Sequence, residues 1–191
     1  MSVTSTSPED TRIIGAALGP VLLPGDVISL SGDLGAGKTV LVQGLAASLG
    51  VRDRVTSPSF TIVHEYKGRY PILHIDVYRL NSFQEVIDLG FEELLDPGAV
   101  LVVEWGEAVA PMLPMRYLEI DMRQGEGDDE RILYFKPHGI EWATKLESMR
   151  ATAEALLDAA SPGESTEARF AYALAPSPRT YGGDHPAGRE D

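Results

Sequence analysis

Strand-like apolar runs alternate with helical patterns along the chain. Six runs rich in Val, Ile, Leu and aromatic residues have the length of β-strands, and they occupy residues 27–31, 61–66, 72–78, 100–103, 117–122 and 131–135. The uninterrupted apolar run at 100–103 is typical of a strand covered on both faces. Lys67, Gly68 and Arg69 separate the second run from the third, which predicts an antiparallel hairpin.

Helical signals fill the intervals between these runs. Apolar spacing and capping residues predict helices at 8–18, 40–49, 82–89, 91–95 and 140–160. Ser7, followed three positions later by Asp10, predicts a capped start for the first helix. Gly50 stands where the second helix should end, and Ser82 with Glu85 forms a capping box for the third.

Composition limits the classes of protein that this chain can belong to. Its 191 residues suit one domain, and the 43% hydrophobic content is enough for a core. The absence of cysteine excludes disulfides and thiolate metal sites. A formal net charge of −13 disfavours direct binding to nucleic acid, so any RNA contact is expected to come from a partner. No apolar run approaches the roughly 20 residues of a membrane span, and we expect a cytoplasmic protein with no membrane contact.

The strongest chemical signal lies between the first predicted strand and the second predicted helix. Residues 32–39 fit the phosphate-binding pattern of Gly, four residues and Gly-Lys-Ser/Thr. Glycines let backbone N–H groups point at phosphates, and the following helix adds its positive end. Lys38 would reach the β- and γ-phosphates, and the Thr39 hydroxyl would complete a magnesium shell. The residues expected to bind the nucleotide are Gly32, Asp33, Leu34, Gly35, Ala36, Gly37, Lys38, Thr39 and Val40.

This loop and the alternation of strands with helices predict the fold class. We expect an α/β protein, a P-loop NTPase-like three-layer sandwich whose mixed sheet is parallel around the glycine loop and antiparallel at the hairpin. Residues 1–138 would form the ATPase domain and residues 139–160 a C-terminal helix. Residues 161–191 are rich in Pro, Gly, Ser and charge, which predicts a disordered tail.

Two acids end apolar runs and are candidates for the carboxylate that a triphosphate site requires. Asp76 follows the run that starts at Ile72, and Glu104 follows Val103. Ligand sites in open α/β sheets lie at the carboxyl ends of parallel strands, where both acids would project. Either acid therefore qualifies as the metal-binding and catalytic carboxylate. For Asp76 the glycine loop favours this role over that of a surface acid or a helix-dipole partner, and for Glu104 the uninterrupted apolar run before it favours the same role.

A hydroxyl-rich segment follows the second predicted helix, where nucleotide switches commonly contact the γ-phosphate or its metal. Its hydroxyls belong to Thr56, Ser57, Ser59 and Thr61. A proline turn with local Ser/Thr hydrogen bonds explains the segment equally well.

Three aromatic or imidazole side chains have weaker signals. Trp105 directly follows Glu104, so it would stack on the base or close the site, although a lone Trp more often lies in the core. His64 and His74 stand on neighbouring predicted strands and would face each other. Without spaced acids they make a poor metal site, and we interpret them as structural.

The type of nucleotide follows from a missing motif. Guanine sites carry Asn-Lys-x-Asp, and the only asparagine, Asn81, is followed by Ser82 and Phe83. ATP is therefore favoured over GTP. A small-molecule kinase uses the same loop, although this chain has no arginine-rich lid segment. A nucleotide-gated binding module is the non-enzymatic alternative.

Four blocks together resemble one family. They are residues 32–39, the Thr-Ser-Pro-Ser-Phe-Thr segment at 56–61, the His-Ile-Asp-Val-Tyr-Arg-Leu segment at 74–80, and Val-Glu-Trp at 103–105. In order and spacing they are similar to the bacterial tRNA threonylcarbamoyladenosine biosynthesis ATPases, TsaE (also YjeE), over roughly residues 7–135. Ser59 stands where that family usually has Thr, which keeps the hydroxyl.

The resemblance implies a magnesium-dependent ATPase that is slow on its own. It would act with a threonylcarbamoyl transferase and its companion subunit, of the TsaD and TsaB type, to modify adenosine 37 of ANN-decoding tRNAs. Thr39 and Glu104 would bind or position Mg²⁺, Asp76 would support the metal in a second switch, and Trp105 would be functional. The chain from about Gly139 onward is longer than the family core.

Overall fold

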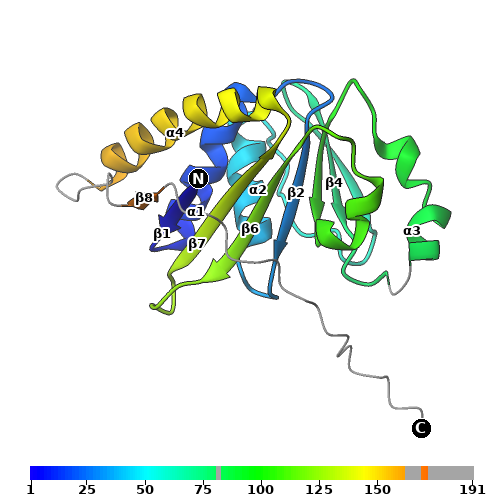
Figure 1. The fold of residues 1–191 in the computed structure, drawn as a ribbon, viewed down its shortest axis with the longest axis horizontal. Helices are drawn as coiled ribbons and strands as arrows, with labels where there is room; N and C mark the ends of the chain where they lie inside the picture. The colour runs from blue at the N-terminus through cyan, green and yellow to red at the C-terminus, as the bar shows by residue number, and fades with distance from the viewer. Residues whose placement is uncertain (81–82, 162–168, 172–191) are drawn as a thin grey trace, which may run out of the picture.

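The protein folds around one mixed β-sheet (Figure 1). The computed structural model describes residues 1–80, 83–161 and 169–171. The eight strands lie in the order β3-β4-β5-β2-β6-β7-β1-β8. Their bounds are β1 Ser2–Ser5, β2 Val27–Gly32, β3 Val63–Lys67, β4 Pro71–Asp76, β5 Val100–Glu104, β6 Tyr117–Gln124, β7 Arg131–His138 and β8 Phe170–Ala171. The central strands β4, β5, β2 and β6 are parallel, whereas β3, β7 and β8 each pair antiparallel with a neighbour.

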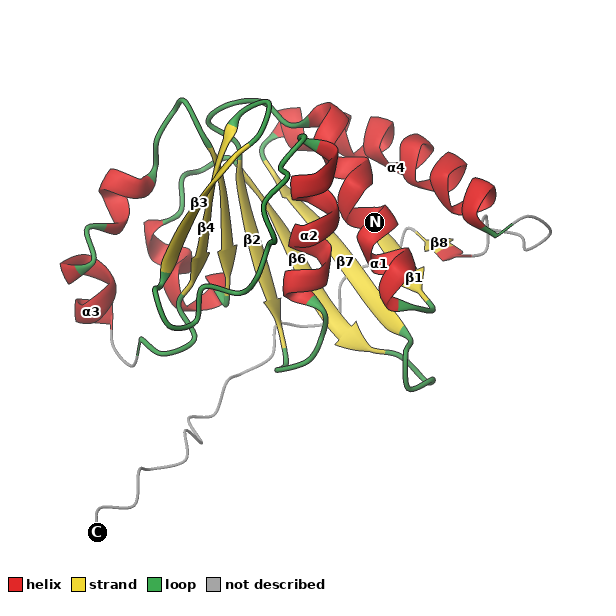
Figure 2. Ribbon diagram, turned by 180° about the vertical axis from the view of Figure 1, so that it is seen from behind, coloured by secondary structure: helices red, strands yellow, loops and turns green. Residues whose placement is uncertain are grey.

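Helices cover the two faces of the sheet unequally (Figure 2). The helices are α1 Pro8–Leu18, α2 Lys38–Ser48, α3 Phe83–Asp88 and α4 Ile140–Ala160, with 3₁₀ turns η1 Gly19–Val21, η2 Phe91–Leu94 and η3 Gly106–Met112. The long helices α1, α2 and α4 lie together on one face. The short elements α3, η2 and η3 pack on the opposite face, so the predicted three-layer α/β fold is confirmed with a thinner third layer.

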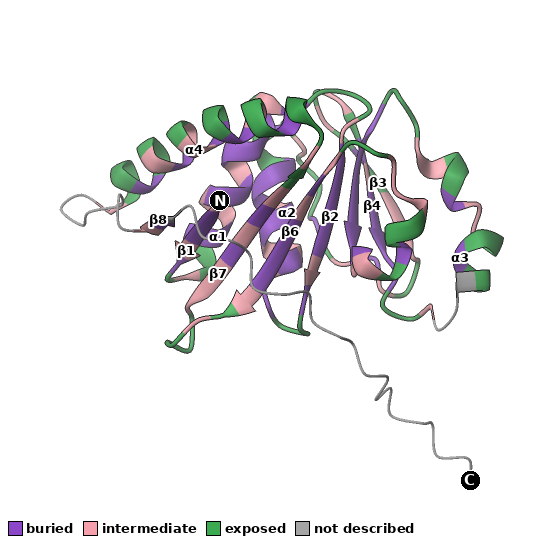
Figure 3. Cartoon of the chain, viewed as in Figure 1, coloured by how far each residue is buried: buried purple, intermediate pink, exposed green. Residues whose placement is uncertain are grey.

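Two apolar clusters fill the space between these layers. The larger one joins Ile28 and Leu30 of β2 to Leu41 and Leu45 of α2 and extends as far as Leu157 of α4. The smaller one packs Val86, Phe91 and Val109 against the strands β4 and β5. Each fully buried aliphatic or aromatic side chain contributes about 1.5–3 kcal/mol. All five residues of β5, the strand between β4 and β2 in Figure 3, are buried, which confirms the expected two-sided coverage.

The predicted elements largely coincide with those of the structure. The helices at 8–18 and 140–160 have the predicted bounds, and the Ser7 side chain caps α1 by accepting from the Asp10 N–H. The β3–β4 hairpin is confirmed, with His64 directly opposite His74. Residues 91–94 form a 3₁₀ turn rather than an α-helix. The predicted cap at Ser82 lies outside the described residues.

Part of the expected tail has a defined position. Phe170 is only 9% exposed and belongs to the larger cluster, and β8 pairs antiparallel with β1. Arg169 Nη1 donates to Asp10 Oδ2 at 3.0 Å. The rest of residues 161–191, apart from Ser161, lies outside the described part, so disorder there stays a prediction. Within the described segments, no helix combines the length and apolar composition of a bilayer span.

Candidate functional site

The phosphate-binding loop connects β2 to α2 at the carboxyl end of the parallel strands. Gly32, Gly35 and Gly37 all have positive φ, at 132°, 80° and 100°, which only glycine adopts without strain. A Cβ on Gly32 would also lie 2.3 Å from the Met122 carbonyl oxygen, so the close approach of β6 requires glycine there. The loop therefore has the conformation that the motif predicts.

A cavity of about 360 Å³ opens over this loop. Its lining comes from the loop, the start of α2, the hydroxyl-rich segment and the ends of β4 and β5: Leu34, Gly35, Gly37, Lys38, Thr39, Val40, Ser57, Ser59, Asp76, Tyr78, Glu104 and Trp105. Segments distant in sequence thus converge on the expected nucleotide site.

Lys38 is almost completely buried at the floor of this cavity, with 5% exposure. Its Nζ donates to the carbonyl oxygens of Gly32 at 2.7 Å and Asp33 at 3.0 Å, and it lies 3.7 Å from the centroid of the Trp105 ring. Burial lowers the pKa of Lys38 below its ordinary value, and Glu104 is the foremost of the nearby carboxylates that oppose this shift. An anion that reaches this desolvated ammonium gains a strong electrostatic interaction.

Glu104 connects the loop helix to the sheet. It ends β5, is 3% exposed, and its Oε1 accepts the Thr39 hydroxyl at 2.8 Å. The same oxygen lies 2.9 Å from His74 Nε2, on the neighbouring strand β4. These two contacts satisfy a buried carboxylate that would otherwise be costly.

Asp76 lies beside Glu104 in the parallel register of β4 and β5. Its Oδ2 accepts the hydroxyls of Ser57 at 2.5 Å and Ser59 at 2.6 Å, and its Oδ1 accepts the Tyr78 N–H at 3.0 Å. The second acid therefore fixes the hydroxyl-rich segment against the sheet.

The donor set suits a magnesium ion that is shared with phosphate. Thr39, Asp76 and Glu104 offer hydroxyl and carboxylate oxygens to one cavity, and Mg²⁺ prefers such oxygens. Among the described residues, no group of three or more His, Cys, Asp or Glu side chains is placed to hold a metal by itself. This is the ordinary situation in sites where phosphates and waters complete the shell.

Several predicted site residues lie away from the cavity. Gly32, Asp33 and Ala36 shape the loop without lining the cavity, and Ala36 packs into the core. Thr56 and Thr61 are exposed and do not line it either. The Tyr66 hydroxyl instead accepts the Thr56 N–H and donates to the Thr56 carbonyl oxygen.

Trp105 is close to the phosphate-binding end of the site. Its ring covers Lys38 and lies 4.9 Å from the Tyr78 ring, centroid to centroid. Its backbone has φ +62°, a conformation that is uncommon for a residue other than glycine and that concentrates at functional sites. The ring thus lies over the lysine of the phosphate-binding loop, beside the Tyr78 ring.

Two residues in contact with the site were missed from the sequence. His74 was interpreted as structural, yet it contacts Glu104, and its place two positions before Asp76 on one strand was a signal that both face the same side. Tyr78 lines the cavity and follows Asp76 by two residues; it belongs to the 74–80 segment that carries the family resemblance, but that segment gave this side chain no role of its own.

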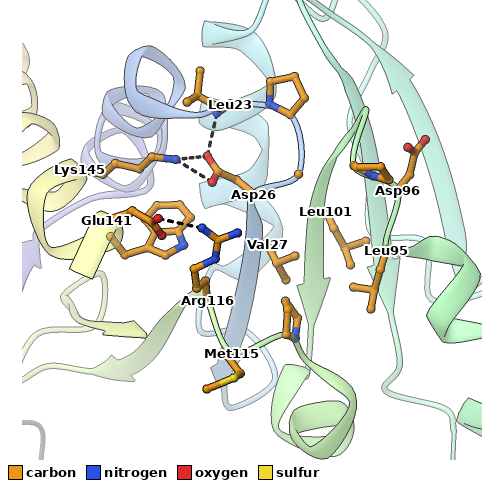
Figure 4. A pocket seen from close by; sticks show the side chains of 15 residues that line it. Leu23, Asp26, Val27, Leu95, Asp96, Leu101, Met115, Arg116, Glu141 and Lys145 are labelled. Atoms are coloured by element: carbon orange, nitrogen blue, oxygen red, sulfur yellow. Dashed lines mark hydrogen bonds and ion pairs between the residues drawn. The ribbon is translucent and has the colours of Figure 1, made fainter. Parts of the chain in front are cut away.

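A second, larger cavity of about 570 Å³ lies among residues at the starts of β2 and β5 (Figure 4). Four of its charged side chains form two pairs, Lys145 with Asp26 at 2.5 Å and Arg116 with Glu141 at 2.8 Å, and Asp96 accepts the Gly98 N–H. Ligand sites in open α/β sheets form at the opposite, carboxyl end of the strands. The smaller cavity is therefore the candidate site despite its size.

The strand, glycine loop and helix, with two acids at adjacent strand ends, define the class: an α/β protein with a P-loop nucleotide-binding site. The chain belongs to the TsaE family, because the family described as "Threonylcarbamoyl adenosine biosynthesis protein TsaE" matches residues 5–133.

Individual relatives agree with this assignment. A protein named "tRNA threonylcarbamoyladenosine biosynthesis protein TsaE" from Treponema pallidum is 43% identical over 123 residues, covering 64% of this chain and 91% of its own. The protein of the same name from Bacillus subtilis is 41% identical over 136 residues, covering 71% and 84%. The crystal structure of B. subtilis YdiB superposes with a TM-score of 0.69 at 35% identity, covering 79% of this chain and 94% of YdiB.

Proposed function

We propose that this chain is a magnesium-dependent ATPase required for threonylcarbamoyladenosine modification of adenosine 37 in ANN-decoding tRNAs. The names of its relatives support the pathway. The hydrogen bond from Thr39 to Glu104 carries the ATPase assignment, because it joins the phosphate-binding loop to a buried carboxylate at a strand end.

The residues of the cavity have distinct roles in this proposal. The loop N–H groups and Lys38 bind the phosphates, while Thr39, Glu104 and Asp76 hold or position Mg²⁺. The metal neutralises charge on the phosphate oxygens when it is bound. Glu104 also orients the water that attacks the γ-phosphorus as the bond to the β-phosphate oxygen breaks and ADP leaves. Asp76 links this chemistry to the segment of Ser57 and Ser59.

ATP is the proposed nucleotide because the sequence has no guanine-recognition motif. Competition of unlabelled ATP and GTP for a fluorescent ATP analogue tests this choice. Equal displacement by the two nucleotides would contradict it.

Partner proteins complete the proposed activity. We propose a threonylcarbamoyl transferase and its companion subunit, of the TsaD and TsaB type, in the cytoplasm, with tRNA contacted only through them. The net charge of −13 supports indirect contact with RNA. Leu34 is 78% exposed and Tyr78 43% exposed where they line the cavity, which offers apolar surface to a partner beside the nucleotide.

Depletion of the protein followed by mass spectrometry of tRNA nucleosides tests the function. We expect threonylcarbamoyladenosine to disappear, to return with the parent gene, and to stay absent with Lys38→Ala at equal protein level. Unchanged modification on depletion would refute the pathway. ATP turnover that rises with a small metabolite and not with the partner proteins would favour a kinase instead.

A further inference from the structure

His74 is a completely buried histidine in direct contact with the proposed catalytic acid. It lies on β4, two positions before Asp76, with 0% exposure. Its Nε2 is 2.9 Å from Glu104 Oε1, and Glu104 itself is 3% exposed. His74 Nδ1 is buried and has no hydrogen-bond partner among the described residues, so Nε2 is the ring nitrogen that serves the carboxylate, and a carboxylate oxygen takes such a contact as the acceptor.

Glu104 is thereby held from two sides. The Thr39 hydroxyl approaches Oε1 from the start of α2, and the His74 ring approaches the same oxygen from β4. One donor alone leaves Oε1 able to move about that contact, whereas two donors from different elements fix where Oε1 lies, and the covalent link to the Glu104 side chain then limits the positions open to Oε2. Both contacts use Oε1, which leaves Oε2 to serve the reaction.

The ring of His74 is itself held in place. The Tyr66 ring lies beside it at 6.2 Å, centroid to centroid, with an interplanar angle of 37°. His64, directly opposite on β3, contacts the Tyr66 hydroxyl rather than the acid. A packed imidazole with a single polar target is well suited to orienting that target.

We propose that His74 is a positioning residue for the proposed ATPase reaction, which orients the Glu104 carboxylate through its Nε2–H. This inference rests on the proposed function, since it assigns to His74 an effect on turnover through Glu104. The alternative is that His74 only fills space in the core.

Three variants separate the two explanations. His74→Gln keeps an amide donor near the position of Nε2, His74→Asn has the same chemistry but too short a reach, and His74→Leu keeps bulk without a donor. We expect the Leu and Asn variants to lower kcat for ATP about 10- to 100-fold, as loss of a group that orients a metal-site ligand typically does. The Gln variant should recover most of the activity, and KM for ATP should change little in all three.

His64→Leu is the matched control, because it removes a histidine from the paired position without touching Glu104. We expect its turnover to equal that of the parent. Similar losses in the Gln and Asn variants, or a loss confined to melting temperature, would overturn the positioning role. The comparison of Gln with Asn remains decisive even if the Leu variant does not fold.

A double-mutant cycle identifies the route of the effect. If His74 acts through Glu104, His74→Leu should cost little further activity in a Glu104→Gln background, whereas independent effects would multiply. Multiplying losses would overturn the inference. Parental turnover of Glu104→Gln alone would instead refute the catalytic assignment in the proposed function. An inactive Glu104→Gln with a fully active His74→Leu would refute only the role of His74.

Discussion

The hydroxyl of Thr39 donates to Glu104 Oε1 at 2.8 Å across 65 positions of sequence. One strand away, Asp76 accepts hydrogen bonds from Ser57 and Ser59 instead. The two acids thus stand side by side but are attached to different segments, Glu104 to the phosphate-binding helix and Asp76 to the hydroxyl-rich loop. This division leads to different expectations for their replacement.

Replacement of Lys38 by Ala should lower ATP turnover by about 100-fold or more, because it removes a preorganised charge that stabilises the phosphoryl oxygens. The fold should persist, since burial already disfavours the charged ammonium. Steady-state phosphate release and thermal melting measure the two effects. Lys67→Ala, an exposed lysine of the hairpin, is the control. Parental turnover of the Lys38 variant at saturating Mg²⁺ and ATP would contradict this prediction.

Glu104→Gln should depress hydrolysis more than nucleotide binding, because the amide retains the size of the side chain but lacks its charge. We expect kcat to fall at least about tenfold, which is the order of magnitude found for loss of acid–base or metal-site groups. The Kd for ATP should stay within about threefold of that of the parent. Isothermal titration measures the Kd for ATP, and turnover assays measure kcat. A larger loss of ATP affinity than of turnover would show that Glu104 acts mainly in binding the nucleotide and not in the hydrolysis step.

Asp76→Asn should weaken the dependence of turnover on Mg²⁺ and the stimulation by partners. An amide accepts the Ser57 and Ser59 hydroxyls less strongly than a charged carboxylate does, so the hydroxyl-rich segment should also loosen. Magnesium titrations of turnover, together with hydrogen exchange over residues 56–61, measure both effects. If the variant matches the parent in both, Asp76 has neither role.

Phe170→Ala should lower stability by about 2 kcal/mol, less than the roughly 3–5 kcal/mol of a central core phenylalanine, because Phe170 lies at the sheet edge. Phe60→Ala, at a site 85% exposed, should change stability by less than about 0.5 kcal/mol.

Truncation after residue 160 should destabilise the protein more than truncation after residue 171, with ATP binding retained in both. Chemical denaturation ranks the variants, and equal stability for the two truncations would show that residues 169–171 contribute nothing.

Turnover of the isolated protein should be slow and should rise when the transferase partners are added. Nucleotide affinity should change by the same factor as the affinity of the nucleotide-bound protein for its partners, because coupling between sites is reciprocal. Titration of the purified partner pair into an ATPase assay and into a nucleotide-binding assay measures both quantities. No change in either would favour the small-molecule kinase.

The sequence predicted those features that depend on local chemistry. The hairpin follows from Lys67 to Arg69 between two apolar runs, and the start of α1 follows from Ser7 and its cap. The loop follows from three glycines, each of which has positive φ in the structure. Local patterns suffice here because neighbouring residues determine each conformation.

Features that depend on distant pairing escaped prediction. β1 has four residues, mostly polar, and exists because Val3 is buried and its backbone pairs with Leu133 of β7. The contact of His74 with Glu104 requires the relative position of β4 and β5, which neither strand specifies alone. The docking of Phe170 escaped prediction because its short apolar stretch, residues 170–174, lies within a segment rich in Pro, Gly, Ser and charge.

The place of β1 in the sheet has a consequence for synthesis on the ribosome. Ser2 pairs with Tyr134, so β1 leaves the exit tunnel ahead of its partner β7 and has to wait for it until more than a hundred further residues have been translated. Contacts with such long sequence separation form slowly, and unpaired strands are exposed to aggregation meanwhile. With only four residues, β1 presents little exposed edge to other chains during that wait. On the side where β7, β1 and β8 lie, the sheet is thus completed by a strand that was translated well before the neighbours it joins.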